Sequence, residues 1–331
     1  MSASIVAPTA GAITRAADRL RAGELVAFPT ETVYGLGADA SQALAVRKIF
    51  AAKGRPAAHP LIVHLPDASH VDRWARAFPE GARALAHAFW PGPLTLVLPR
   101  AAQASDIVTG GQDSVGLRVP SHPIARGLLA AFDGGIAAPS ANRFGRISPT
   151  TAHHVADDLG AAVAMILDGG PCTVGIESTI VAFVGDDPVL LRPGGIEAQA
   201  LARVLGRAPH VPDARAPRAS GTLPSHYAPK TPATLVAADA LRAEIAQLKE
   251  RDEDVAVLAR TVPRPADFSD DWLQAPADAA AYAHDLYANL RTLDAANADV
   301  ILIETVPDDD AWLAVRDRLS RAARGEDDDR D

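Results

Sequence analysis

Two short segments in the first half of the chain carry side chains that are suited to binding anions. Lys53-Gly54-Arg55-Pro56 places an ammonium and a guanidinium two residues apart, where the helical pattern of residues 41–52 ends. We expect this loop to aim both cations outward. Ser140-Ala141-Asn142 follows the apolar residues 136–138, so a hydroxyl and a carboxamide lie at the carboxyl end of a predicted strand, where open α/β sheets bind ligands. Together the two segments predict a site for a nucleoside triphosphate.

A polar segment follows the first predicted strand, residues 24–28. Pro29 to Gly37 contains hydroxyls, a carboxylate, a phenol and two glycines, and we interpret it as a binding loop because side chains at a strand end converge on ligands. Residues 35–40 also match a loose dinucleotide-binding pattern. Six residues separate Gly35 from the strand, however, and no acidic residue ends the next strand, so we do not predict a nicotinamide site.

Arg118 lies inside the apolar strand pattern of residues 115–119 and needs a partner for its charge. An internal Asp or Glu is one candidate, and the carboxylate or phosphate of a ligand is the other, because either fits the fork of the guanidinium. Cys172 has no identifiable base to activate it and is interpreted as a small buried residue. Metal-ligand spacing is also missing around the histidines that we considered, which are His59, His64, His153 and His154.

The composition bounds the class of protein. The chain has 331 residues, of which 48% are hydrophobic and 5% aromatic, and this favours a soluble globular protein of two domains. Its net charge of −9 argues against a protein whose main task is to grip a nucleic acid backbone. There is no apolar run of membrane-spanning length, no secretion signal is recognisable at the start, and a single cysteine excludes an internal disulfide. We therefore expect a cytoplasmic location and no membrane partner.

Helical and strand patterns alternate over residues 9–205 and predict one α/β domain with a large twisted sheet. The apolar runs at residues 179–183 and 189–191 are joined by Gly185-Asp186-Asp187-Pro188, which predicts an antiparallel hairpin and therefore a mixed sheet.

A proline-rich interval separates this domain from a second one. We divide the chain into a first domain at residues 1–206, a linker at 207–232 and a second domain at 233–331. Strands alternate with helices in the last part, so the second domain is expected to be small, parallel and Rossmann-like. The acidic end, residues 326–331, is interpreted as a disordered tail.

Taken in order, the motifs of the first domain resemble the YrdC-domain L-threonylcarbamoyladenylate synthases. The segment Ser220–Lys230 and the domain after it resemble the long, two-domain form of that family. The match covers most of residues 9–205 and is weaker beyond them. The segments that carry it are Pro29–Gly37, Lys53–Pro56, His59–Leu61, Trp90–Thr95, Arg118–Pro120, Ser140–Asn142, Ser148–Thr150, Asp168–Gly170, Gly175–Val181 and Leu191–Gly194.

The resemblance implies an ATP-dependent nucleotidyltransferase. Such an enzyme joins L-threonine, bicarbonate or CO2, and ATP into threonylcarbamoyl-AMP, releases pyrophosphate, and supplies the downstream tRNA threonylcarbamoyltransferase machinery. Mg²⁺ would accompany ATP, and since no acidic cage is obvious we expect water and nucleotide oxygens to supply most of its ligands. Whether tRNA is bound directly is left open.

The resemblance also assigns roles to particular residues. Its catalytic signature maps onto Lys53, Arg55, Ser140 and Asn142. Residues implied to bind ATP are Arg55, His59, Ser114, Ser140, Ser148, Arg192 and Tyr227. Residues implied to bind threonine are Thr32, His64, Arg118, Ala138 and Ser178. The chain departs from the family at His59, where members commonly carry Asn, and at Ser114 and Ala138, where they often carry Thr.

Tyr227 lies in the proline-rich linker, so we expect residues 207–232 to fold over the first domain as a lid that excludes water from a hydrolysable intermediate. Two other functions stay open at this point. One is an RNA-binding or regulatory module that uses the same groove. The other is a carbamoyl-transfer enzyme, although the zinc-finger cysteines expected alongside are missing.

Overall fold

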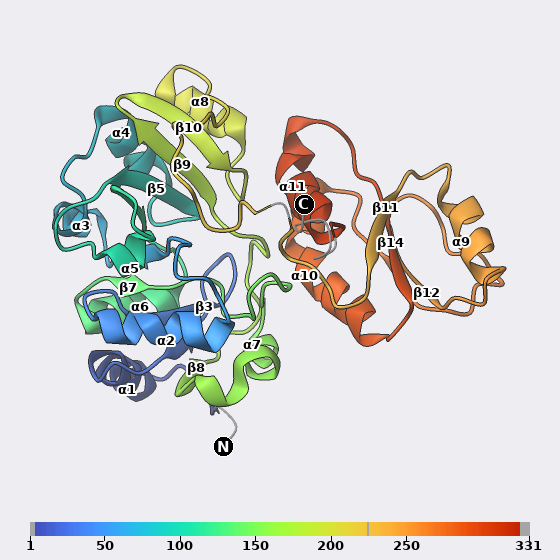
Figure 1. Cartoon of the computed structure of the whole chain (residues 1–331), viewed down its shortest axis with the longest axis horizontal. Helices are drawn as coiled ribbons and strands as arrows, with labels where there is room; N and C mark the ends of the chain where they lie inside the picture. The colour runs from blue at the N-terminus through green and yellow to red at the C-terminus, as the bar shows by residue number, and fades with distance from the viewer. Residues whose placement is uncertain (1–3, 224, 325–331) are drawn as a thin grey trace. The chain divides into compact units, whose positions relative to one another are not determined.

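The computed structural model describes residues 4–223 and 225–324, so the acidic segment 326–331 lies outside the described residues. The chain forms two compact units (Figure 1). The division falls after Thr222, and the short segment Gly145–Ile147 belongs with the second unit. Unit 1 therefore contains both anion-binding segments predicted above.

In the described residues of unit 1, ten strands form one mixed sheet in the order β1-β8-β2-β3-β7-β4-β6-β5-β9-β10. The predicted hairpin is confirmed, because β9 and β10 pair antiparallel. β4 pairs parallel with β6, and β6 pairs antiparallel with β5. The strands are β1 (Ile5–Val6), β2 (Val26–Phe28), β3 (Gly35–Asp39), β4 (Ile62–His64), β5 (Leu94–Pro99), β6 (Ser114–Arg118), β7 (Ile136–Ala137), β8 (Met165–Leu167), β9 (Thr179–Val184) and β10 (Asp187–Arg192).

Helices cover the two faces of this sheet unequally. The larger core lies between one face and α2, α3, α4, α5, α7 and α8, whereas α1 and α6 pack on the other face against β2, β7 and β8. Alternation along β2 explains the division, since Ala27 faces the larger core while Val26 and Phe28 face α1 and α6. The helices are α1 (Ala10–Arg21), α2 (Ala43–Lys53), α3 (Val71–Trp74), α4 (Glu80–Phe89), α5 (Asp106–Thr109), α6 (Pro123–Phe132), α7 (Ala152–Leu159) and α8 (Ala198–Leu205).

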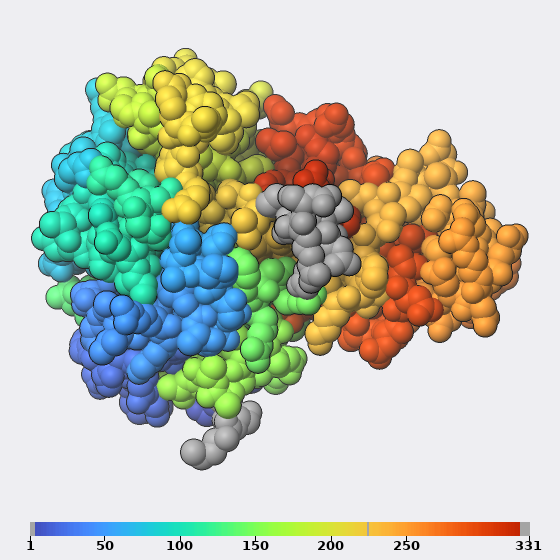
Figure 2. Space-filling model, in the orientation of Figure 1, coloured from blue at the N-terminus to red at the C-terminus, as the bar shows by residue number. Residues whose placement is uncertain are grey.

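The half of the second face formed by β5, β9 and β10 is covered by linker residues. Ala216 and Ala219 pack there against apolar side chains that include Val97 and Ile180. Figure 2 shows the residues after α8, in yellow, on the outer surface of unit 1. β4 and β6 lie between the strands covered by helices and the strands β5, β9 and β10. The linker residues Arg218–Ser220 reach over part of this central strip, because they line a small cavity together with Ile62 and Ser114.

The prediction of a loop over residues 29–37 is wrong at its end. Gly35 and Gly37 lie in β3, which pairs antiparallel with β2. A Cβ at Gly37 would come within 2.9 Å of the Phe28 ring and 3.1 Å of the Val26 carbonyl oxygen, so close packing of the strands requires glycine there. Gly35 and Gly37 therefore allow β2 and β3 to pack closely. The polar residues Thr30, Glu31 and Thr32 precede β3 and are the part of the segment that can contribute to a binding site.

Unit 2 contains four parallel strands in the part of the chain that the structure describes, in the order β11-β14-β12-β13. This agrees with the predicted small parallel sheet. The strands are β11 (Ala233–Val236), β12 (Val255–Ala259), β13 (Trp272–Gln274) and β14 (Val300–Glu304), and the helices are α9 (Leu241–Lys249), α10 (Ala279–Ala295) and α11 (Leu313–Ala322).

Candidate active site

Lys53 is the last residue of α2 and connects the two predicted anion-binding segments. Gly54 ends the helix in the left-handed conformation, with φ of 65°. The Lys53 ammonium donates to the backbone oxygens of Ser140, at 2.6 Å, and Asn142, at 2.5 Å, and lies 3.4 Å from Asn142 Oδ1. Burial, and then the charge of Arg55, lower the pKa of Lys53 well below its ordinary value. The expectation of an outward-pointing lysine is wrong, because its side chain is needed to hold the Ser140–Asn142 segment.

Arg55 is also buried rather than aimed outward, with 6% of its surface exposed. Its Nη2 donates to the Pro60 carbonyl oxygen at 3.0 Å and to Ser220 Oγ at 3.2 Å, and the guanidinium lies over the Phe144 ring. His59 packs against the same ring. Partial burial and the neighbouring Arg55 lower the pKa of His59, so this side chain is neutral at pH 7.

A second cluster lies in a row across β4, β6 and β5. The strand register pairs His64 with Arg118, and its next step places Thr95 opposite Arg118. All three side chains are buried. Burial, and then the charge of Arg118, lower the pKa of His64 to about 3, so the ring is neutral. The row offers a cation, an imidazole and a hydroxyl on one face of the sheet.

Glu31 supplies the internal partner that Arg118 requires. Arg118 Nη2 donates to Glu31 Oε1 at 2.8 Å, and the other carboxylate oxygen accepts the Ser121 N–H at 3.1 Å. The open question about Arg118 is thus answered by a carboxylate of the chain itself. Its Nε is buried and has no hydrogen-bond partner among the described residues, so one donor direction is left for another acceptor.

Ser178 and Arg192 continue this surface toward β9 and β10. Ser178 Oγ lies 2.8 Å from Thr95 Oγ1 and accepts from Arg192 Nη2 at 3.3 Å. Arg192 also donates to the backbone oxygens of Ser178, at 2.9 Å, and Ser220, at 2.7 Å. Its guanidinium is therefore fixed between the start of β9 and the linker.

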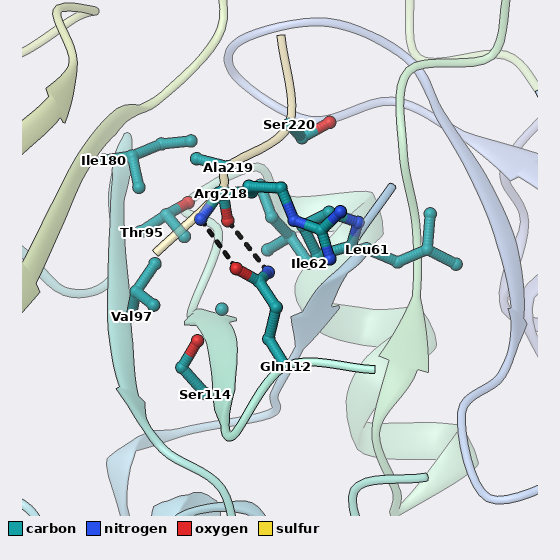
Figure 3. Close-up of a pocket in the computed structure, with 12 residues that line it drawn as sticks. Leu61, Ile62, Thr95, Val97, Gln112, Ser114, Ile180, Arg218, Ala219 and Ser220 are labelled. Atoms are coloured by element: carbon teal, nitrogen blue, oxygen red, sulfur yellow. Dashed lines mark hydrogen bonds between the residues drawn. The ribbon is translucent and has the colours of Figure 1, made fainter. Parts of the chain in front are cut away.

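The other predicted residues of unit 1 lie near these two clusters with part of their hydrogen-bonding capacity in use. Thr32 Oγ1 is buried 2.8 Å from Thr30 Oγ1. The Ala138 N–H already donates to the Ile62 carbonyl oxygen. Ser148 Oγ is buried and donates to Glu177 Oε1 at 2.5 Å. Ser114 lines a small cavity with Thr95 under the linker (Figure 3).

Tyr227 belongs to unit 2 and has a positive φ of 63°. Its ring packs against His226, at 4.2 Å between centroids, and Tyr287, at 5.6 Å, and the Arg318 guanidinium lies 5.2 Å from its centroid. Aromatic and cationic neighbours therefore hold this tyrosine rigidly within unit 2. Its predicted contact with ATP stays a prediction.

The two clusters of unit 1 are spaced along β4. Arg55 binds the Pro60 carbonyl just before this strand, and His64 ends it beside Arg118. At about 3.3 Å per residue, these two points are roughly 13 Å apart. This spacing separates the Lys53 and Arg55 cluster from the His64 and Arg118 cluster along one strand.

Buried cations outnumber buried acids at this surface. In the described part of unit 1, Arg55, Arg118 and Arg192 are at most 6% exposed at this surface, and the carboxylates buried beside them are those of Glu31 and Glu177. A polyanion is the ligand that such an imbalance favours. Among the described residues, no group of three or more His, Cys, Asp and Glu side chains is arranged to hold a metal ion, and Cys172 is buried with its pKa raised to about 12 by burial, which makes it unreactive.

Several residues of the site were not singled out by the sequence analysis. Glu31 pairs with the predicted residue Arg118, which is 87 positions away in the sequence. Glu177 pairs with the predicted residue Ser148, which is 29 positions away. Thr95 and Ser220 reach the site through strand register and through the linker. Strand alternation marks Thr95 as the polar residue of an apolar strand, and that is the one signal that could have identified it.

This fold and surface define an α/β domain of the YrdC type, followed in the sequence by a small unit with a parallel sheet. The family model described as "Telomere recombination", for Sua5, YciO and YrdC, matches residues 18–194, and the model for the C-terminal domain of threonylcarbamoyl-AMP synthase matches residues 196–324. The chain belongs to this family, the Sua5-type threonylcarbamoyl-AMP synthases.

Relatives match both units together. Threonylcarbamoyl-AMP synthase of Pyrococcus abyssi is 40% identical over 93% of each chain, and that of Bacillus subtilis is 42% identical over 95% of this chain and 93% of its own. The crystal structure of P. abyssi Sua5 complexed with L-threonine is 39% identical, covers 95% of each chain and superposes with a TM-score of 0.87. In the described part of this chain, no helix has the length and apolarity needed to cross a membrane.

Proposed function

We propose that this protein is an L-threonylcarbamoyladenylate synthase, a nucleotidyltransferase that forms threonylcarbamoyl-AMP and pyrophosphate from L-threonine, bicarbonate or CO2, and ATP. The observation that carries the proposal is the pairing of two clusters on one strip of sheet, one around Lys53 and Arg55 and one around Arg118. The names of relatives that match at about 40% identity over nearly the whole chain support it. The product would pass to the tRNA threonylcarbamoyltransferase machinery.

At the phosphate end, Arg55 and Arg192 would bind ATP oxygens. The Pro60 carbonyl holds the Arg55 guanidinium and the Ser178 carbonyl holds that of Arg192. The two side chains therefore lose little conformational entropy when a phosphate binds. Lys53 would hold Ser140 and Asn142 in place, and these two residues would line the path of the α-phosphate. Charge that develops on the phosphoryl oxygens is then met by donors that are already oriented.

At the other end, Arg118 would bind the threonine carboxylate. The Glu31 pair fixes one edge of its guanidinium, and the buried Nε of the same group offers a donor. Neutral His64, together with Thr32, Ser178 and the backbone at Ala138, would contact the rest of the amino acid. The bound L-threonine named for the P. abyssi structure supports an amino acid subsite in the family.

In the proposed reaction, the threonine amine adds to CO2 and loses a proton to give a carbamate. A carbamate oxygen then attacks the α-phosphorus, the bond from that phosphorus to the β-phosphate oxygen breaks, and pyrophosphate leaves. The chain contributes mainly positioning, which can be worth on the order of 7–11 kcal/mol of the barrier, and electrostatic stabilisation. Mg²⁺ would be held largely by phosphate oxygens and water, in keeping with the carboxylates that are present, because Glu31 is engaged by Arg118 and Glu177 by Ser148.

The test is direct product analysis. Purified protein is incubated with ATP, Mg²⁺, bicarbonate and L-threonine, and threonylcarbamoyl-AMP is measured by mass spectrometry alongside pyrophosphate. We expect both products, with threonylcarbamoyl-AMP at no more than the amount of pyrophosphate because it hydrolyses after release, and neither product when any one substrate is omitted. Pyrophosphate release that is independent of threonine, or no threonylcarbamoyl-AMP in the complete mixture, would reject the proposed function.

A further inference from the structure

Gln112 binds the linker backbone with both ends of its side-chain amide. Its Oε1 accepts the Arg218 N–H at 2.7 Å, and its Nε2 donates to the Arg218 carbonyl oxygen at 3.1 Å (Figure 3). Nε2 also lies 3.4 Å from the Thr109 carbonyl oxygen, which keeps the amide oriented. A side-chain amide that satisfies both backbone groups of one residue acts as a single rung of a β-ladder, and it fixes where that residue lies.

The segment fixed in this way is the strap, Arg218–Ser220. Ala219 packs on Val97 and Ile180. The Ser220 hydroxyl oxygen accepts a hydrogen bond from Arg55, and its carbonyl oxygen accepts one from Arg192. The Arg218 side chain adds one exposed hydrogen bond, to the Gly110 carbonyl oxygen. In this state the strap thus supplies acceptors to both guanidiniums that are proposed to bind ATP.

Little space remains beneath the strap. The cavity between it and the sheet is lined by Thr95, Ser114 and Ile62, among others, and measures about 10 Å³ (Figure 3). That volume is room for about one water molecule. A nucleotide that contacts Arg55, Ser114 and Arg192 together must therefore move the strap away from the sheet and take over the acceptor positions of Ser220.

We propose that Gln112 is a positioning residue that latches the strap over the nucleotide site and so sets the ATP concentration at which the site opens. The inference rests on the proposed function, because it takes Arg55, Ser114 and Arg192 to be ATP-binding residues. Gln112 itself does not touch the nucleotide. It acts through the strap, by lowering the fraction of molecules that are competent to bind ATP.

Loosening the latch therefore improves the apparent affinity for ATP. Each hydrogen bond between an uncharged amide and the backbone shifts an equilibrium by roughly two- to tenfold, so loss of both in Gln112→Ala lowers KM for ATP by about fivefold or more. kcat and KM for L-threonine stay near their wild-type values, because the strap is held by hydrogen bonds with Gln112, Arg55 and Arg192 rather than with Arg118 and His64, which are proposed to bind threonine. Gln103→Ala, the same change at an exposed position of unit 1, is the matched control and leaves all three constants unchanged.

Limited proteolysis reports on the strap without requiring activity. Trypsin cleaves after Arg218 only when the strap leaves the sheet, so Gln112→Ala is cut there faster than wild type, and Gln103→Ala is not. Adding ATP with Mg²⁺, but no threonine, speeds cleavage after Arg218 in the wild type. The fragments are identified by mass, because Arg215 offers a second site nearby.

An unchanged or raised KM for ATP in Gln112→Ala would overturn the proposal, as would protection of Arg218 from trypsin by ATP. If Gln112→Ala does not fold, Ser220→Ala replaces it. That variant removes the hydroxyl held by Arg55, and the same fall in KM for ATP is expected, to a smaller extent. Absence of threonylcarbamoyl-AMP in the wild type would reject the proposed function alone, and the effect of ATP on cleavage would still decide whether a nucleotide displaces the strap.

Discussion

Arg118 Nη2 lies 2.8 Å from Glu31 Oε1, and both side chains are buried. Arg118 lies at the end of β6, in the middle of the large sheet. Burial by itself raises the pKa of Glu31, but the charge and hydrogen bond of Arg118 outweigh it and hold this pKa below its ordinary value. The pair is therefore ionised at neutral pH. It orients a guanidinium whose remaining edge is proposed to bind the threonine carboxylate.

Arg118→Lys tests that role. Lysine keeps the positive charge but loses the fork that serves Glu31 and a second carboxylate at the same time. We expect KM for L-threonine to rise by about tenfold or more, while KM for ATP stays within experimental error. Steady-state pyrophosphate release measures both constants. A variant whose KM for threonine matches the wild type would remove Arg118 from the threonine site.

The buried pair also contributes to stability. Glu31→Ala leaves Arg118 buried without its counter-charge, and such changes cost about 3–5 kcal/mol in the free energy of unfolding. Since the pKa of Glu31 is lower in the folded chain, this contribution is present at neutral pH and is lost as the pH falls through that pKa. Urea denaturation at pH 7 and pH 4 measures both effects.

The matched control is Asp113→Ala. Asp113 pairs with Arg76 on the surface, where solvent screens the interaction, so we expect no measurable change in the free energy of unfolding. Equal effects of the two substitutions would show that burial of the Glu31 pair has no energetic consequence.

Lys53→Met tests the lysine that joins α2 to the Ser140–Asn142 segment. Methionine has a similar length but no donor, so three oxygens lose the ammonium and the segment loses its position. We expect kcat/KM for ATP to fall by about 100-fold or more. Lys48→Met is the control on the same helix, because Lys48 donates to the Gly23 carbonyl oxygen and, among the described residues, makes no hydrogen bond to the Ser140–Asn142 segment. Similar kinetics for the two variants would argue against a role for Lys53.

His64 predicts a particular pH dependence of stability. Burial lowers its pKa to about 3 in the folded chain, against about 6.5 when unfolded, so below pH 6.5 the unfolded chain binds more protons and stability falls. At pH 5 this effect amounts to about 2 kcal/mol. His64→Gln lacks it, so the difference in unfolding free energy between wild type and variant should shrink by that amount from pH 7.5 to pH 5. If the difference in unfolding free energy between wild type and His64→Gln did not change with pH, the lowered pKa of His64 in the folded chain would be contradicted.

Local patterns in the sequence predicted the elements and several of their relations. The hairpin of β9 and β10 follows from a short turn between apolar runs, and the small parallel sheet follows from alternation of strands and helices. β3 was predicted as a loop because its glycines carry no strand pattern, and their purpose becomes visible only where Gly37 meets Phe28. Packing between strands, rather than propensity, decided that segment.

For the candidate site, the sequence predicted the residue types but not their environment. Lys53 and Arg55 were expected to face solvent, because a loop broken by glycine and proline usually lies at the surface. Their burial depends on Ser140, Pro60 and Ser220, which are 87, 5 and 165 positions away from them. The contacts with Ser140 and Ser220 have no local signature, and the pairing of Gln112 with Arg218 over 106 positions has none either.

Amino acid selectivity of pyrophosphate release is the most direct test of the central claim, which is that one strip of sheet holds ATP at one end and L-threonine at the other. The protein is given ATP, Mg²⁺ and bicarbonate with L-threonine, L-serine or glycine in turn. We expect kcat/KM to be highest for L-threonine and to fall for the two smaller amino acids, which leave part of the pocket unfilled. Equal rates with all three, or release without any amino acid, would contradict the account.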